Sequence, residues 1–431
     1  MRADIKPVLA PAIRLDQYDP KTSAPASLPA SGPTAVLVCH GMGQQVPFET
    51  LDCVAHAICA AHGGGSAQVR ARLVQLGSDD NTVSRVELEL RSDASGEVRH
   101  IHLYEAYWAP LTEGAIGYWR ATWFLLRAGW EGLMASLAGS FDRWMFGGRR
   151  RLKVKNGTAQ LLLALLFVLA PCLAMAGLAF YVVAYLLLER FDWELSAHPW
   201  WYAAALPLLV ASYFIRRFVI QYMGDVAIYV SSNEVNEFWR IRDEIKGIGM
   251  RAASVVYRAL ASAHAGTAAP VFEYGKVVVV GHSLGSVVAY DTLNALFRKD
   301  QASNGLHAAE RSHAFITLGS PLDKTAFLFR QHVGDAVVRE ALAATVQPMI
   351  QSYSFRPRWW INVHARADII SGALDYYDEP PGTPDPRRVR DVADPVWALP
   401  AKAHKGYWQR EATRMVLYQA VTDGLSARFG P

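Results

Sequence analysis

The chain has 431 residues, of which 52% are hydrophobic and 19% charged, and its formal net charge is +4. This apolar content excludes a disordered chain, and ordinary numbers of Gly and Pro exclude a collagen-like or low-complexity fibre. The small net charge and the scattered basic residues argue against a nucleic-acid partner.

The four cysteines form no C-x-x-C pair and no cluster with histidine: they are Cys39, Cys53, Cys59 and Cys172. A disulfide framework is therefore excluded, and we expect reduced thiols in a protein that faces the cytosol. At the N-terminus, residues 1–33 are rich in Pro, Ala and Ser and contain no apolar signal core. They predict a flexible arm without a secretory signal.

Residues 34–110 predict the first part of an α/β domain. Thr34–Cys39 (TAVLVC) is a short apolar run that predicts a buried parallel strand, and residues 50–62 follow a helical pattern. Two more strands are expected at 83–91 and 98–107. Alternation in VELEL predicts that the first of them is half exposed and lies near the edge of the sheet.

Residues 111–223 predict a membrane-associated region. No charged residue occurs over 159–188, and a helix of that length would measure about 45 Å, against a hydrocarbon core of about 30 Å. A weaker signal near 200–220 predicts a second span, with an interfacial or re-entrant helix as the alternative. Mixed Trp and Arg residues over 114–146 fit equally well an interfacial helix or an ordinary amphipathic helix packed on the domain.

Charge bias predicts the orientation of this transmembrane hairpin. Five basic residues lie between Arg149 and Lys155, and Arg216 and Arg217 follow the second apolar stretch, whereas the intervening loop contains only Arg190. The positive-inside rule then places both termini and the segments on either side of the hairpin in the cytoplasm, and we expect the membrane to be a bacterial-type inner membrane. The lipid bilayer is accordingly an expected partner.

Residues 224–431 predict the second part of the α/β domain. A mainly helical region over 224–264 is followed by apolar runs that predict strands at 276–280, 313–318 and 360–365, and residues 407–425 predict a helix. Strands that alternate with helices indicate a mostly parallel sheet covered on both faces. We therefore expect one α/β domain interrupted by the hairpin.

The strongest chemical signal is Gly281-His282-Ser283-Leu284-Gly285, which fits G-x-S-x-G between a buried strand and a helix. Glycines at 281 and 285 allow the strand and helix backbones to approach each other closely. The turn would raise Ser283 above the sheet as a nucleophile. An ordinary glycine-rich turn between strand and helix is the alternative.

A serine nucleophile needs a base, and the base needs an orienting acid; in this architecture they follow in the order Ser, acid, His. Asp368 comes just after a late strand and is the expected acid, with Asp323 and Asp375 as competitors. His404 precedes the last helix and is the expected base. Three other histidines are less well placed: His282, His332 and His364.

Backbone N–H groups must stabilise the negative charge that develops on the substrate oxygen. One is expected from Leu284, directly after the nucleophile, and the other from the loop after the first strand, where Gly41 precedes Met42. Met42 is the expected donor, and Gly43 or Gln44 would serve if the register differs by a residue or two. A plain tight turn is the alternative.

Together, HGMG, GHSLG, the late acid and the C-terminal histidine resemble the α/β-hydrolase superfamily. GHSLGSVVAYDTL and FITLGSPL look like lipases, especially phospholipases of the DDHD type, and His404–Trp408 resembles their HxxYW stretch; the Asp-Asp-His-Asp signature itself is absent. This resemblance implies a serine hydrolase that cleaves lipid or phospholipid esters through an acyl-enzyme, without a metal or cofactor. The resembled phospholipases lack such a hairpin, so the membrane anchor is expected from the apolar run over 159–188 alone. The alternatives are a non-catalytic membrane scaffold and an esterase or thioesterase for a soluble substrate.

Overall fold

The structure is a computed structural model that describes most of the chain outside 113–236. Besides several residues between 177 and 190, it describes 7–42, 45–63, 65–77, 81–112, 237–261, 269–303, 305–323, 325, 347–351, 355–368, 370–374, 377, 387–396 and 400–429. The chain divides into two compact units, residues 1–109 with 242–431 and residues 110–241. In the second unit, the described residues between 177 and 190 are helical.

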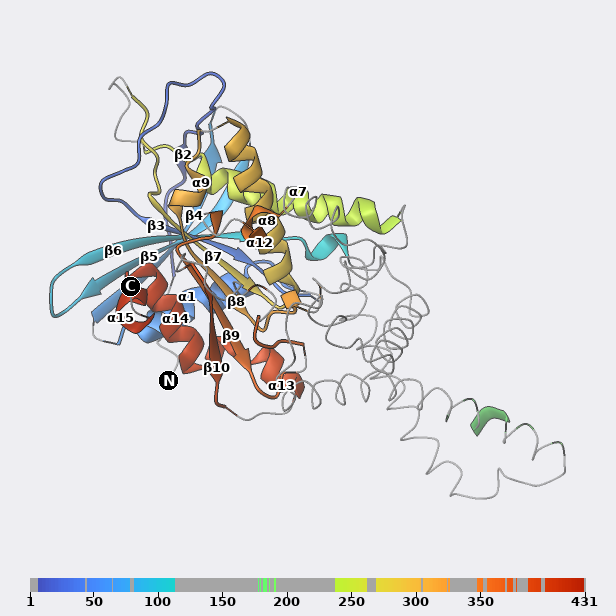
Figure 1. Ribbon diagram of the computed structural model, residues 1–431. Helices are drawn as coiled ribbons and strands as arrows, with labels where there is room; N and C mark the ends of the chain where they lie inside the picture. Colours follow the sequence, from blue (N-terminus) through green and yellow to red (C-terminus); the bar gives the residue numbers. More distant parts are fainter. Residues whose placement is uncertain are drawn as a thin grey trace. The chain divides into compact units, whose positions relative to one another are not determined.

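The first unit is built on one mixed sheet with the strand order β1-β4-β5-β6-β3-β7-β8-β9-β10, and β2 also pairs with β4 (Figure 1). Only β5 runs against its neighbours; every other pairing is parallel. The strands are β1 (Val8–Leu9), β2 (Ile13–Leu15), β3 (Thr34–Cys39), β4 (Gly65–Leu76), β5 (Thr82–Ser92), β6 (Val98–Ala106), β7 (Lys276–His282), β8 (Ser312–Leu318), β9 (Trp359–Ala365) and β10 (Val389–Asp394).

Helices cover both faces of this sheet. Figure 1 shows α1 and α14 on one side and α7 and α8 on the other. The helices are η1 (Ala109–Leu111), α1 (Glu49–Ala61), α7 (Glu237–Tyr257), α8 (Leu284–Ser303), α9 (Ala308–Arg311), α12 (Pro348–Gln351), α13 (Pro400–Lys405), η7 (Tyr407–Gln409), α14 (Glu411–Val421) and α15 (Leu425–Phe429). Two covered faces explain why the central strands β3 and β7 are continuous apolar runs rather than alternating ones.

The predicted fold class is confirmed at the level of a mostly parallel α/β sheet flanked by helices, an arrangement compatible with an α/β-hydrolase. The strands predicted at 34–39, 98–107, 276–280, 313–318 and 360–365 are present as β3, β6, β7, β8 and β9. Strands β1, β2, β4 and β10 were not predicted. For β4, the alternation in QVRARLVQ was the available signal.

Expectations about the N-terminal part of the domain hold only in part. Strand β5 is half exposed, as predicted, and β4 with the short strands β1 and β2 separates it from the edge of the sheet. Residues 7–33 are not a free arm: Leu15 and Tyr18 are buried, and Tyr18 packs against Phe272 with ring centroids 5.2 Å apart. The paired backbone of β1 and β2 supplies hydrogen bonds that composition alone does not reveal.

Most of the predicted membrane region lies outside the described residues, including 114–146, most of the first predicted span and the whole of the second. Within the described residues, no helix combines the length and the apolar character that crossing a bilayer requires. The hairpin and its orientation remain predictions.

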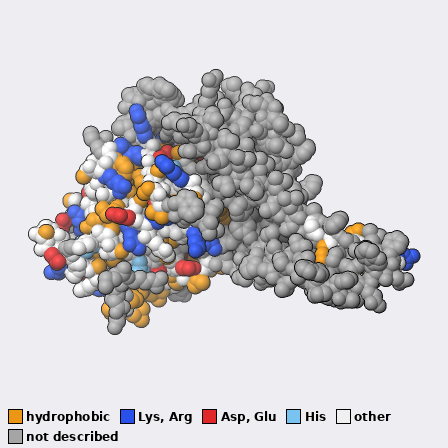
Figure 2. Space-filling model, turned by 90° about the horizontal axis from the view of Figure 1, so that it is seen from below, with side chains coloured by type: hydrophobic (Ala, Val, Ile, Leu, Met, Phe, Trp, Pro, Cys, Tyr) orange, Lys and Arg blue, Asp and Glu red, His pale blue; other side chains and the backbone are white. Residues whose placement is uncertain are grey.

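The described thiols and charges agree with an ordinary folded domain. Cys39 and Cys59 are buried free thiols, and burial raises the pKa of Cys39 to about 12 and that of Cys59 to about 11. These two thiols are therefore protonated and unreactive at neutral pH. On the face shown in Figure 2, the described Lys and Arg side chains are spread among apolar, acidic and neutral atoms.

Candidate active site

The candidate site lies where the strand order reverses. From β3 the chain first builds β4, β5 and β6 on one side, and then returns to place β7 on the other side of β3. Loops that leave the carboxyl ends of parallel strands at such a point diverge and leave room for a ligand. The loop after β3 and the turn after β7 both leave the sheet there (Figure 1).

Ser283 occupies a sharp turn between β7, which ends at His282, and α8, which begins at Leu284. Its φ of 51° lies in the left-handed region, which is strained for a serine. The turn is held by the N–H of Ser283, which donates to the carbonyl of Leu318 at 2.9 Å, and by the N–H of Ser286, which donates to the carbonyl of Ser283 at 3.0 Å. This strained conformation fixes the direction of the hydroxyl.

The motif glycines are required by close packing. A Cβ atom on Gly281 would lie 2.5 Å from the Cα of Ser286, and one on Gly285 would lie 2.1 Å from the carbonyl oxygen of His40. A Cβ on Gly41 would lie 3.2 Å from the Cβ of Ser283. The start of α8 therefore packs directly on the end of β3, which brings the loop after β3 against the serine.

We expect Gly285→Ala to destabilise the fold by about 3 kcal/mol or more, because its methyl group would overlap backbone that cannot move aside cheaply. Gly247→Ala in α7 is the matched control, since its methyl group would meet only the flexible end of Arg251 at 3.3 Å. The control should be neutral or stabilising by up to about 1 kcal/mol. Denaturant unfolding of both variants measures the difference, and equal stabilities would contradict the packing argument.

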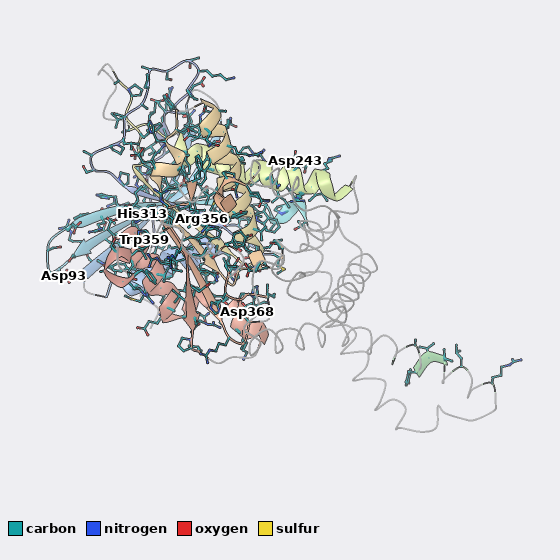
Figure 3. The ribbon with its side chains drawn as sticks, viewed as in Figure 1. Asp93, Asp243, His313, Arg356, Trp359 and Asp368 are labelled. Carbon is teal, nitrogen blue, oxygen red and sulfur yellow. The ribbon has the colours of Figure 1, made fainter. Side chains whose placement is uncertain are left out.

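Three side chains from distant parts of the chain form a continuous hydrogen-bonded line. The Oγ of Ser283 lies 2.8 Å from Nε2 of His404, and Nδ1 of His404 lies 2.9 Å from Oδ2 of Asp368. All three are buried, with exposures of 1% for Ser283, 7% for His404 and 1% for Asp368. In Figure 3, Asp368 lies beside α13, the helix that carries His404.

The donors around this line determine the tautomer of His404. An ionised carboxylate only accepts hydrogen bonds, so Nδ1 of His404 carries the proton that faces Asp368. Nε2 is then free to accept the hydroxyl proton of Ser283. His404 can therefore deprotonate the serine hydroxyl, and the carboxylate of Asp368 stabilises the positive charge that the imidazole then carries.

Asp368 is held ionised by donors from two parts of the chain. Its Oδ1 accepts from the N–H groups of Ile370 at 2.9 Å and Ser371 at 3.4 Å, and its Oδ2 accepts from the hydroxyls of Ser371 and Tyr407, both at 2.8 Å. Burial alone would raise the pKa of Asp368. The hydrogen bond and charge of His404, with those further donors, outweigh burial and hold this pKa well below its usual range.

Tyr407 is a supporting residue whose role the sequence analysis missed, although it lies in the HxxYW-like stretch. Its side chain is fully buried, and burial raises its pKa well above the usual value, so it remains a hydrogen-bond donor. The Tyr407 oxygen also accepts the N–H of Ala365 at 2.9 Å, at the end of β9. Tyr407 thus ties the acid to both its strand and the segment that follows His404.

The short helix α13 is held in place from behind. Nη2 of Arg410 donates to the carbonyl of Ala403 at 2.7 Å, directly before His404, and Nη1 of Arg410 forms a buried ion pair with Asp394 at 2.6 Å. On its other side, Nε2 of His282 donates to the carbonyl of His404 at 3.2 Å. Burial lowers the pKa of His282 to about 3, so its ring is neutral and acts by positioning.

The predicted oxyanion donors are Leu284, which directly follows the serine, and Met42, which follows the Gly41 that packs against the serine. Leu284 is the first residue of α8, where a backbone N–H has no partner within the helix. Met42 is buried in the loop after β3, one residue beyond Gly41. The alternatives Gly43 and Gln44 lie outside the described residues.

The remaining competitors do not join this line of contacts or cannot be placed. Asp323 is buried in the segment after β8, but the carboxylate that contacts His404 is that of Asp368. His364 lies within β9. Asp375 and His332 are outside the described residues. Within the described part of the chain, no group of three or more His, Cys, Asp or Glu residues could hold a metal ion.

Comparison with known proteins agrees with this chemistry. Residues 208–339 match the model of a family described as "Putative serine esterase (DUF676)", which is less than a third of the 431 residues. The matched segment contains β7, the serine turn, α8 and β8, and ends before Asp368 and His404. The searches of curated proteins and of solved structures found no match. This part of the chain is therefore similar to serine esterases, which supports a hydrolase.

Proposed function

We propose that the protein is a serine hydrolase that cleaves carboxylic esters through an acyl-enzyme, with Ser283, His404 and Asp368 as its catalytic triad. The observation that carries this proposal is the continuous line of two hydrogen bonds, 2.8 and 2.9 Å long, from Ser283 through His404 to Asp368. The line ends at a serine in a strained turn, where the N-terminus of α8 and the loop after β3 meet.

The reaction follows from the proton positions assigned to Ser283 and His404. The Oγ of Ser283 attacks the ester carbonyl carbon while its proton passes to Nε2 of His404, and Asp368 stabilises the imidazolium that forms. The N–H groups of Leu284 and Met42 stabilise the oxyanion. His404 then gives its proton to the leaving alcohol as the carbon–oxygen bond breaks. Water, deprotonated by His404, attacks the acyl-enzyme and releases the carboxylic acid and the serine.

The substrate we propose is a lipid or phospholipid, drawn from a membrane in which the chain is anchored by the hairpin over 159–188 and 200–220. The thirty uncharged residues at 159–188 support the anchor. Exposed apolar side chains support an apolar substrate: Val46 and Phe48 follow β3 and Val396 follows β10, with exposures of 65%, 48% and 52%. Strands β3 and β10 run in the same direction. All three residues therefore follow the carboxyl-terminal ends of strands, which is the end of the sheet that carries the site.

Activity-based labelling of washed membranes tests both parts of the proposal. The full-length protein should stay in the membrane pellet after carbonate extraction, react there with a fluorophosphonate probe, and carry the label on the peptide that contains Ser283. In detergent, long-chain phospholipids should be cleaved faster than short water-soluble esters. A lack of labelling at any pH would indicate a non-catalytic scaffold. Release by carbonate, with labelling retained, would indicate a hydrolase of soluble esters or thioesters.

A further inference from the structure

We infer that Ser286, Ser320 and His40 are positioning residues that aim the two oxyanion-hole N–H groups by holding the carbonyl oxygens of the same peptide groups. The inference rests on the proposed function. In a trans peptide the C=O and the N–H point in opposite directions, so an anchor on the oxygen also fixes the direction of the hydrogen. The N–H of Leu284 shares its peptide group with the carbonyl of Ser283, and the N–H of Met42 shares its own with the carbonyl of Gly41.

A chain of hydroxyl groups holds the first carbonyl. The hydroxyl of Ser286 lies 2.6 Å from the carbonyl oxygen of Ser283, and a carbonyl can only accept, so Ser286 donates its one proton there. The hydroxyl of Ser320, 2.7 Å from that of Ser286, must then be the donor in their contact. Ser320 in turn accepts the N–H of Leu322 at 3.2 Å. Every proton in this chain is assigned, and each hydrogen bond points toward the carbonyl of Ser283.

These hydroxyl groups are shielded from bulk solvent, because Ser283, Ser286 and Ser320 are all buried, with exposures of at most 1%. Hydrogen bonds in such surroundings are electrostatically stronger than in water. The consequence is that the segment after β8 supports the serine turn from behind. The N–H of Leu284 is thereby directed out of the end of α8, toward the position that the substrate oxygen would take.

A histidine ring holds the second carbonyl. The N–H of Trp108 donates to Nε2 of His40 at 2.9 Å, so Nδ1 of His40 carries the proton and donates to the carbonyl of Gly41 at 2.7 Å. The ring of His40 is fully buried and stacks on that of Trp108 with centroids 4.6 Å apart. Burial lowers the pKa of His40 to about 4, which keeps this single tautomer at neutral pH.

The first experiment compares Ser286→Ala with the double variant Ser286→Ala/Ser320→Ala. The single variant loses the hydroxyl anchor, although the N–H of Ser286 still donates to the carbonyl of Ser283 at 3.0 Å. It also leaves the buried hydroxyl of Ser320 without its acceptor, which costs stability. The double variant removes that orphaned hydroxyl and should recover stability while kcat stays low. We expect kcat for an ester to fall roughly 10- to 100-fold in both, which is less than the loss of a whole donor, with KM almost unchanged.

A trifluoromethyl ketone gives a readout that a purely structural role would not change. It binds as an oxyanionic adduct of Ser283, so its affinity should fall in parallel with kcat in both variants. The pH profile of kcat/KM should keep its shape, because the contacts of His404 and Asp368 are untouched. Recovery of kcat together with stability in the double variant, or unchanged ketone affinity, would overturn the inference.

The His40 anchor is tested by a pair of amide substitutions. In His40→Asn the amide nitrogen occupies roughly the place of Nδ1 and can still donate to the carbonyl of Gly41, whereas in His40→Gln it lies near the place of Nε2. We expect Asn to retain more kcat than Gln at comparable stability, and the reverse order would contradict the role of Nδ1. Failure of the proposed function itself would look different, since the wild-type protein would then show no activity that depends on Ser283.

Discussion

Ser283→Ala should abolish ester hydrolysis while the fold is retained, with kcat lower by roughly 10⁶-fold, as when the nucleophile is removed from other triad hydrolases. The reason is that no other hydroxyl contacts His404 Nε2 among the hydrogen bonds of the described residues. The substitution removes one oxygen atom from a buried turn, so the midpoint of thermal unfolding should move by only a few degrees. Hydrolysis of an activated ester and fluorophosphonate labelling measure the loss.

Ser303→Ala is the matched control for this variant. Ser303 is the last residue of α8, is exposed, and donates only to the carbonyl of Lys299 within the same helix at 3.0 Å. Its activity and labelling should equal those of the wild-type protein. Full esterase activity in purified Ser283→Ala would show that Ser283 is not the nucleophile.

The second large effect is expected for Asp368→Asn, with kcat lower by about 10⁴-fold. An asparagine at this position can present its NH₂ to Nδ1 of His404, which favours the tautomer with the proton on Nε2. That proton would face the Ser283 hydroxyl and prevent His404 from acting as a base. The size and shape of the side chain are nearly unchanged, so the packing around Tyr407 and Ser371 should persist.

Asp323→Asn is the control for the choice of the acid, because Asp323 is also buried and also follows a strand of the sheet. Steady-state kinetics should show activity near that of the wild-type enzyme for Asp323→Asn and a large loss for Asp368→Asn. Wild-type activity in a folded Asp368→Asn protein would move the acid to Asp323 or Asp375.

The lowered pKa of Asp368 also predicts a pH dependence of stability. The pKa of Asp368 is lower in the folded protein than in the unfolded protein, where it is about 3.9. The ionised carboxylate therefore stabilises the fold at pH values above the unfolded pKa. This contribution is lost as the pH falls through about 5 and below. The free energy of unfolding should therefore decrease more steeply between about pH 5 and 3 in the wild-type protein than in Asp368→Asn.

The sequence alone was sufficient where the signal is local. Central strands such as β3 and β7 are buried on both faces, so they are continuous apolar runs that need no partner to be recognised. The serine turn is equally local, since Gly281 and Gly285 flank Ser283 within five residues. Chain order then indicated Asp368 and His404 as the residues that would meet it.

Contacts between distant residues were decided only by the tertiary structure. Ser283 and His404 are separated by 121 positions, and Asp368 and Tyr407 by 39, so no periodicity connects them. The contact between Asp368 and His404, the anchoring roles of His40, Ser286 and Ser320, and the packing of residues 7–33 all depend on which groups the sheet brings together. A local pattern identifies which residues can do chemistry, whereas hydrogen bonds across the sheet determine which of them are held in position to do it.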